Sequence, residues 1–155
     1  MFARLFRFAV PLSPKILIVD DVNDSRALVV RTIMRKFPAA VIQEYQDCST
    51  AMVAAGAGNF DVIVAHRAVD LDGLTLVRMF RKVSPQVPIL MLSGIDRTEA
   101  ALEAGATRFH NYDAWLLVGA VIAEMLSPAP AADSPAPFEK RKDPDAQPTA
   151  GAGAT

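Results

Sequence analysis

The stretch KILIVDD, residues 15–21, runs through four consecutive apolar residues into two adjacent aspartates. Comparable apolar runs occur in DVIVA at 61–65 and PILML at 88–92, with more polar ones in AVIQEY at 40–45 and TRFHN at 107–111. Strands that are apolar throughout are typical of a parallel sheet with helices on both faces. We therefore expect the runs at 16–20, 61–65 and 88–92 to be its central strands.

Helical patterns separate these five runs. They begin after Asn23, near Ser49 and at Asp96, where Glu99 would complete a capping box, and the last covers residues 115–126. Strands that alternate with helices indicate right-handed βαβ units. The predicted fold class is α/β, a doubly wound five-stranded parallel sheet with helices on both faces.

Length and composition favour one domain in a reducing compartment. The chain has 155 residues, which we divide into an N-terminal arm at 1–14, a domain at 15–126 and a disordered Pro/Ala-rich tail at 127–155. Its 16 basic and 17 acidic residues give a net charge of -1, so no basic field would attract nucleic acid. The single cysteine and the absence of a long apolar run predict a cytoplasmic protein without stable membrane insertion.

Polar side chains stand at the ends of the candidate strands, where ligands bind in open parallel sheets. Asp20 and Asp21 end the first strand, and Ser93 follows the fourth. Two adjacent carboxylates could hold a hard cation such as Mg²⁺. They could equally serve only to cap the following helix.

The order and spacing of KILIVDD, FDVIV, DG, PILMLSG and ALEAGA resemble the receiver domains of bacterial two-component response regulators, over residues 15–126. The resemblance implies a flavodoxin-like, CheY-like fold and Mg²⁺ bound by the paired acids. It also implies an aspartate at the end of the third strand that takes a phosphoryl group from a histidine kinase. A Ser or Thr and a Lys then read out the modification. By this resemblance Asp20 and Asp21 match the metal pair and Ser93 the switch hydroxyl.

The sequence departs from that family at the phosphorylation site. The phosphoacceptor position falls on His66 when counted forward from Phe60, and on Ala65 when counted back from Asp72. The lysine position holds Tyr112. Without a third carboxylate and a nucleophile, we expect weak Mg²⁺ binding at most, no aspartyl phosphorylation and no enzymatic activity. The pattern predicts a pseudo-receiver that needs no cofactor.

Two histidines, His66 and His110, fall near the same end of the sheet. A transition-metal site formed with Asp20 or Asp21 is one interpretation, since imidazole and carboxylate suit such metals. The interpretation we favour is two partly buried, hydrogen-bonded histidines, because no ligand motif surrounds them.

The last predicted helix is apolar nearly all round and should be covered. We expect Trp115, Leu117 and Val121 to form an interaction face, for a homodimer or a partner. The predicted function is a stand-alone receiver-like signalling module that binds a histidine kinase or another regulator without phosphorylation.

Two alternatives remain open. The first is a conventional regulator that accepts a phosphoryl group on Asp70 or another acid. The second is a receiver that binds a small molecule or cyclic dinucleotide through Arg78, Arg81 and Lys82.

Overall fold

A computed structural model describes residues 10–127, in which five parallel strands form one sheet of order β2-β1-β3-β4-β5. The strands are β1 (Lys15–Asp20), β2 (Val41–Tyr45), β3 (Val62–Arg67), β4 (Ile89–Ser93) and β5 (Arg108–Asn111). The central strands are β1, β3 and β4, as their continuous apolar character predicted. The arm up to residue 9 and the tail from residue 128 lie outside the described residues.

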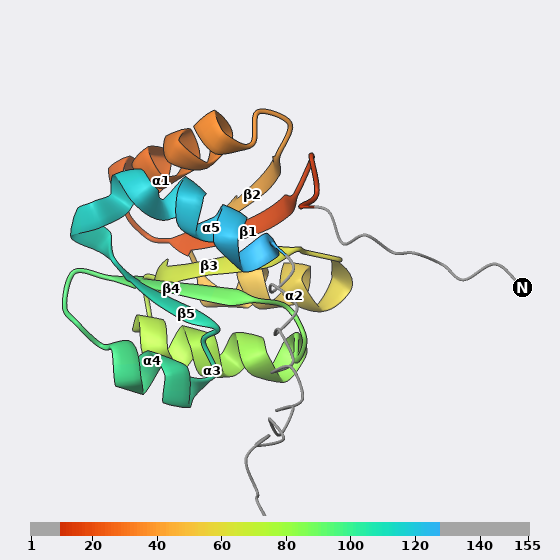
Figure 1. The fold of residues 1–155 in the computed structure, drawn as a ribbon. Helices are drawn as coiled ribbons and strands as arrows, with labels where there is room; N and C mark the ends of the chain where they lie inside the picture. Colours follow the sequence, from red (N-terminus) through yellow and green to blue (C-terminus); the bar gives the residue numbers. More distant parts are fainter. Residues whose placement is uncertain (1–9, 128–155) are drawn as a thin grey trace, which may run out of the picture.

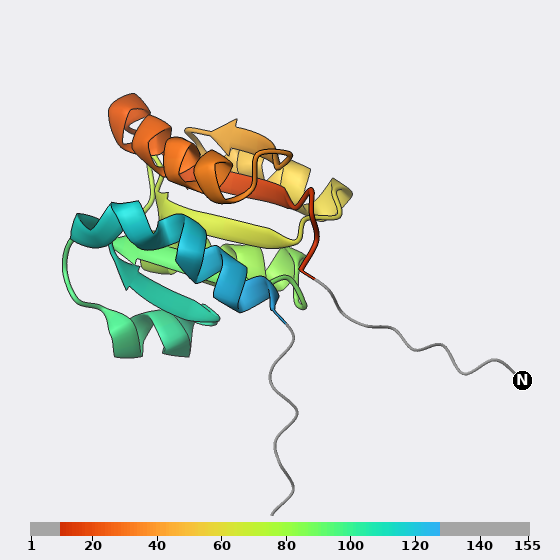
Figure 2. The ribbon, with the colours of Figure 1, turned by 45° about the horizontal axis from the view of Figure 1, so that its top comes forward.

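Helices cover both faces of the sheet, as Figures 1 and 2 show. They are α1 (Asn23–Lys36), α2 (Cys48–Ala57), α3 (Gly73–Val83), α4 (Thr98–Ala104), the 3₁₀ helix η1 (Tyr112–Leu117) and α5 (Val118–Leu126). One face carries α1 and α5, and the other carries α2, α3 and α4. The predicted flavodoxin-like receiver fold is confirmed.

Each central strand supplies side chains to both hydrophobic layers, because successive residues of a strand point to opposite faces. On β3, Val62 and Val64 join the layer under α1 and α5, whereas Ile63 and Ala65 join the layer under α2, α3 and α4. This alternation decides which face of the sheet the next residue, His66, enters.

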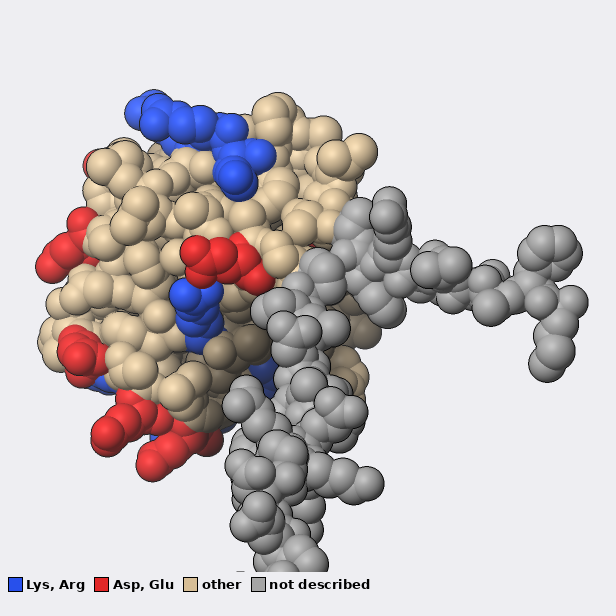
Figure 3. Space-filling model, viewed as in Figure 1, with Lys and Arg blue, Asp and Glu red and all other residues tan. Residues whose placement is uncertain are grey.

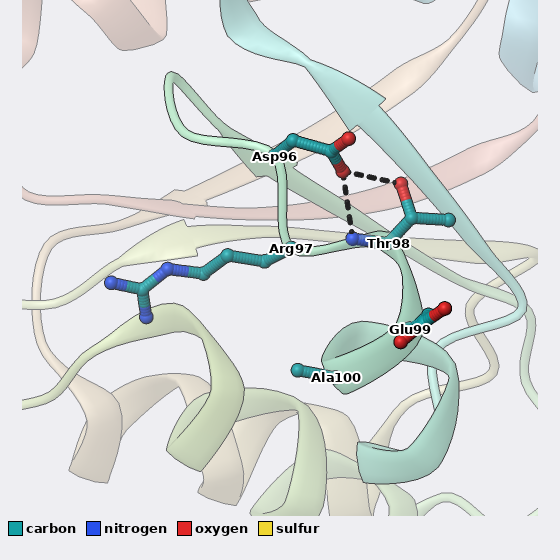
Figure 4. Close-up of a pocket in the computed structure, with 5 residues that line it drawn as sticks. All are labelled: Asp96, Arg97, Thr98, Glu99 and Ala100. Carbon is teal, nitrogen blue, oxygen red and sulfur yellow. Dashed lines mark hydrogen bonds between the residues drawn. The ribbon is translucent and has the colours of Figure 1, made fainter.

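Two helix starts differ from the expected ones. Helix α2 is capped by Asp47, whose carboxylate accepts a bond from the Thr50 N–H, so it begins before Ser49. Ahead of α4, the Asp96 carboxylate accepts bonds from the backbone N–H and hydroxyl of Thr98 at 3.0 and 2.7 Å (Figure 4). The N-cap of α4 has no side-chain cap bond, so the expected capping box is not closed.

The final helical segment is split in two. It starts as η1 and continues as α5 only from Val118, with non-helical backbone angles at Ala114. The Asn111 side chain accepts a bond from the Asp113 N–H, and His110 Nε2 lies 2.9 Å from the Ala114 carbonyl oxygen. These local bonds hold the turn that carries Tyr112 to the edge of the sheet.

Arg81 ties the far end of α3 to the segments around it. Its guanidinium donates to the backbone carbonyls of Gly105, Ser84, Pro85 and Val87 at 2.7 to 3.3 Å. Gly105, which ends α4, has φ +107°, a left-handed conformation that favours glycine. The arginine therefore holds a chain reversal that its local sequence already prefers.

None of the helices in the described part of the chain is long and apolar enough to cross a membrane.

Candidate functional site

The carboxyl ends of the strands bring together the predicted site residues at one edge of the sheet. Asp20 is the last residue of β1, His66 lies near the end of β3, Ser93 ends β4, and Tyr112 follows β5. Asp21 is the first residue after β1. Sequence spacing had placed these residues at this edge, and the structure adds how they contact one another.

Asp20 is 1% exposed and has three hydrogen-bond donors around its carboxylate. The Val22 N–H donates to Oδ1 at 3.0 Å, His66 Nδ1 lies 3.0 Å from Oδ2, and the Ser25 hydroxyl also donates to Oδ2. Because a carboxylate can only accept, Nδ1 of His66 carries the proton of that bond. Burial alone would raise the pKa of Asp20, but the bonds from His66, Ser25 and Val22 together hold it below its ordinary value.

Tyr112 covers the imidazole of His66. The two rings are stacked, with centroids 4.9 Å apart and planes inclined by 8°, and the Tyr112 hydroxyl donates to the Ser25 carbonyl at 3.4 Å. The residue at the expected lysine position therefore closes the site with an aromatic ring. Ser25, which the sequence analysis did not single out, contacts both Asp20 and Tyr112.

A register shift between β1 and β3 falls at the two candidate phosphoacceptor positions. Val19 pairs with Ala65, but the next residue, Asp20, pairs with Arg67, so His66 has no partner on β1. Ala65 is fully buried beneath α3, whereas the His66 side chain is 15% exposed and reaches Asp20. Of the two candidate positions, only His66 therefore contacts the paired acids.

The second acid of the pair is also neutralised within the chain. Arg67 Nε donates to Asp21 Oδ1 at 2.7 Å, with the two side chains 51% and 23% exposed. Sequence reasoning missed Arg67. Its position directly after His66 in β3, opposite two acids at the end of β1, was the signal that could have found it.

The residues at this edge do not fit the Mg²⁺ that the family resemblance implies. Mg²⁺ in proteins is held by carboxylates and waters, and here Ala65 and His66 supply no third carboxylate. Both oxygens of Asp20 already accept protein bonds, and Asp21 is paired with Arg67. A cation would have to displace the hydrogen bonds from His66 and Arg67.

The histidines do not form the transition-metal site that was one of two interpretations. His110 is bonded to the Ala114 carbonyl, whereas His66 is bonded to Asp20. Within residues 10–127 no group of three or more His, Cys, Asp or Glu side chains could hold a metal ion. Both histidines are half-buried and hydrogen-bonded, which is the favoured interpretation.

A hollow of about 480 Å³ opens beside this cluster, between the β3–α3 and β4–α4 loops. Its lining includes His66, Arg67, Asp70, Ser93 and Arg97. The Ser93 hydroxyl accepts a bond from the Ile95 N–H at 3.2 Å, so it is oriented by its own loop.

The predicted interaction face is only partly available. Leu117 is 56% exposed and Trp115 is half-buried, but Val121 is 8% exposed and packs in the core under α1 and α5. The expectation for Val121 was wrong, because α5 turns this residue toward the sheet. The uncovered apolar residues lie in η1, where Leu116 is 63% exposed.

Comparisons with known proteins agree with this architecture. The sequence-family model of the response regulator receiver domain matches residues 16–111 of this chain. No curated protein matches the sequence.

Among solved structures, the chain is similar to the receiver domain of the response regulator NarL from Mycobacterium tuberculosis, with a TM-score of 0.65 and 23% identity over 75% of this chain and 98% of that one. It is similar to the Francisella response regulator 1452 receiver domain, with a TM-score of 0.60 and 22% identity over 73% and 98%. It also resembles the receiver domain of NtrX from Brucella abortus, with a TM-score of 0.58 and 25% identity over 70% and 98%. The chain belongs to the family of response regulator receiver domains.

Proposed function

We propose that this receiver domain transmits its signal by binding another protein without being phosphorylated on an aspartate. The observation that carries the proposal is the bond between His66 and the buried Asp20 carboxylate. In this chain a histidine stands beside the paired acids, where an acyl phosphate would need a carboxylate.

The chemistry of the site supports this proposal at three points. Ala65 has no nucleophile, and Nδ1 of His66 is occupied as a donor to Asp20. His66 and Arg67 donate hydrogen bonds to the two acids that would otherwise attract a cation. The ring of Tyr112 offers no ammonium to pair with a phosphoryl charge. Aspartyl phosphorylation needs a nucleophile, a metal ion and a counter-charge, and at this site each of the three lacks the residue that would supply or hold it.

The partner we propose is a histidine kinase or another regulator in the cytoplasm, and we assign no enzymatic activity. Receiver domains are signalling modules, which suits this assignment.

A conventional regulator that uses Asp70 is the first rival. Asp70 is exposed and lines the 480 Å³ hollow. Burial raises the pKa of the Cys48 thiol at the start of α2, and the charges of Asp70 and Asp47 raise it further. In the described part of the chain no hydrogen bond joins the Asp70 carboxylate to Asp20, whose bonds come from Val22, Ser25 and His66.

A small-molecule or nucleotide receiver that uses Arg78, Arg81 and Lys82 is the second rival. In this reading Arg81 would be the middle one of three cations that bind the ligand, but its guanidinium already donates hydrogen bonds to four backbone carbonyls. Only Arg78 and Lys82 remain exposed on that side of α3.

Intact-mass spectrometry at neutral pH after incubation with acetyl phosphate and Mg²⁺ tests the proposal. The wild-type chain should stay unmodified, whereas His66→Asp combined with Tyr112→Lys should gain one phosphate. A wild-type adduct that disappears in Asp70→Asn would establish the conventional regulator instead. A partner captured from the native organism should bind equally well with and without acetyl phosphate; binding that depends on it would overturn the proposal.

A further inference from the structure

The exposed side of α1 carries a self-complementary row of side chains. Asp24, Leu28, Arg31 and Arg35 are spaced by four, three and four residues, which places them along one side of the helix. Asp24, Arg31 and Arg35 are exposed and Leu28 is half-buried. The row is acidic at its amino end, apolar near its middle and basic at its carboxyl end.

A shallow groove of about 160 Å³ runs beside this row, between α1 and η1. Its lining combines Leu28, Trp115 and Leu116 with Arg31 and Arg35. The Thr32 hydroxyl donates to the Leu116 carbonyl at 2.9 Å and fixes η1 against α1. The groove is therefore a fixed surface with an apolar floor and a basic rim.

The charges of this row have no partner in the described part of the chain. Asp24, Arg31 and Arg35 make no ion pair and no side-chain hydrogen bond there, whereas Arg26 on the same helix pairs with Glu44 at 2.9 Å. Figure 3 shows the basic side chains gathered along the upper edge, where Figure 1 draws α1. An opposite charge pattern would complement this surface.

We propose that the α1–η1 surface binds a second copy of this chain, with the two α1 helices antiparallel across a twofold axis. In that arrangement Asp24 of each copy faces Arg35 of the other, and the Leu28 side chains lie near the axis. Asp24 and Arg35 are eleven residues apart, a separation of roughly 16 Å along the helix at the usual rise. A twofold axis makes both ion pairs form together. This inference is independent of how the domain is regulated.

Arg31 is the one feature of the row that opposes this dimer. It lies near the axis and would bring two like charges close together, and only its long stem lets the guanidinium reach solvent. Arg31→Leu should therefore lower the dimer dissociation constant at least about threefold, since it removes the repulsion and adds apolar area. An acidic partner held by Arg31 would predict the opposite effect on binding.

Sedimentation equilibrium of the full chain over a wide concentration range tests the proposal, with the fluorescence of Trp115 as a second readout. Trp115 is the only tryptophan and lines the groove, so its emission should change as the dimer forms. Asp24→Arg or Arg35→Asp alone should raise the dissociation constant at least about tenfold, because each change creates two like-charge contacts.

An equimolar mixture of those two variants should recover a 1:1 heterodimer, because one copy then carries arginine at both positions 24 and 35 and the other carries aspartate at both. Arg78→Asp, on the exposed side of α3, serves as a matched charge-reversal control and should leave association unchanged. A wild type that stays monomeric at millimolar concentration would overturn the proposal, as would a dimer that survives both single reversals. A mixture of folded variants that does not associate would overturn the antiparallel arrangement.

Discussion

Breaking the hydrogen bond between Asp20 and His66 should cost more stability than breaking the ion pair between Asp21 and Arg67 at the same edge of the sheet. The perturbation is a double-mutant cycle of Asp20→Asn, His66→Ala and their combination. The buried carboxylate keeps its bonds from Ser25 and Val22 in the His66 variant, so the cycle isolates one contact.

The magnitude follows from burial and from the ring stack. A hydrogen bond to a charged group contributes about 1.5–3 kcal/mol, and Asp20 is 1% exposed, so the coupling energy should fall in that range. His66→Ala also removes the stack on Tyr112, which contributes about 0.5–1.5 kcal/mol. The single variant should therefore lower the free energy of unfolding by about 2–4 kcal/mol.

Urea denaturation at pH 7, followed by circular dichroism, measures the four free energies of unfolding. The matched control is the cycle of Asp21→Asn and Arg67→Gln, whose side chains are 23% and 51% exposed. Solvent screening should limit that coupling to about 1 kcal/mol. A coupling below about 0.5 kcal/mol between Asp20 and His66, or one no larger than the control, would refute the reasoning.

The same contact predicts a pH dependence. The hydrogen bonds that outweigh burial place the folded-state pKa of Asp20 below the ordinary unfolded value of about 3.9. Its contribution is thus complete above that value and is lost as pH falls through the lower folded-state pKa. Wild type should lose stability more steeply than Asp20→Asn as pH falls below about 4. Parallel profiles of the two proteins would contradict this.

Three further changes test the fold around the site. Arg81→Lys should lower the free energy of unfolding by about 1.5–3 kcal/mol, because an ammonium cannot reach all four carbonyls. An unchanged urea midpoint would show that the bonds from Arg81 to these carbonyls are dispensable. Gly105→Ala should lower the free energy of unfolding by about 1–2 kcal/mol, because Gly105 has φ +107°. Gly56→Ala is the control and should be neutral or stabilising, because there is open space where its Cβ would lie. Equal losses of stability in the two variants would contradict the backbone argument. Val121→Glu should prevent folding, whereas Leu117→Glu should leave circular dichroism unchanged, and the reverse outcome would contradict the assignment of core and surface.

Much of the fold could be predicted because its strands and helices follow simple periodicities. The central position of β1, β3 and β4 came from continuous apolar runs, and the structure confirms it. The start of α5 could not be predicted in the same way. Apolar residues continue through 115–126, but the bonds at Asn111 and His110 hold the first part as a 3₁₀ turn. Local polar contacts override hydrophobic pattern there.

The site was predicted in composition but not in its contacts. Spacing placed Asp20, His66 and Tyr112 at one edge of the sheet, yet it could not decide between Ala65 and His66. That choice depends on a register shift between β1 and β3, which no residue count contains. The interaction role predicted for Val121 was wrong for a related reason. When a helix is apolar nearly all round, its sequence does not show which side packs against the sheet.

The pairing of both acids with side chains of β3 has a consequence for the surroundings in which the protein works. A divalent ion exchanges with the medium, so a site that relies on one responds to the supply of that ion. His66 and Arg67 are hydrogen-bond donors that are covalently part of the same strand. The partners of the two acids at this edge of the sheet are then fixed at synthesis. Chelators and magnesium starvation, which disable a metal-dependent phosphorelay, should leave the conformation of this domain and its contacts unchanged.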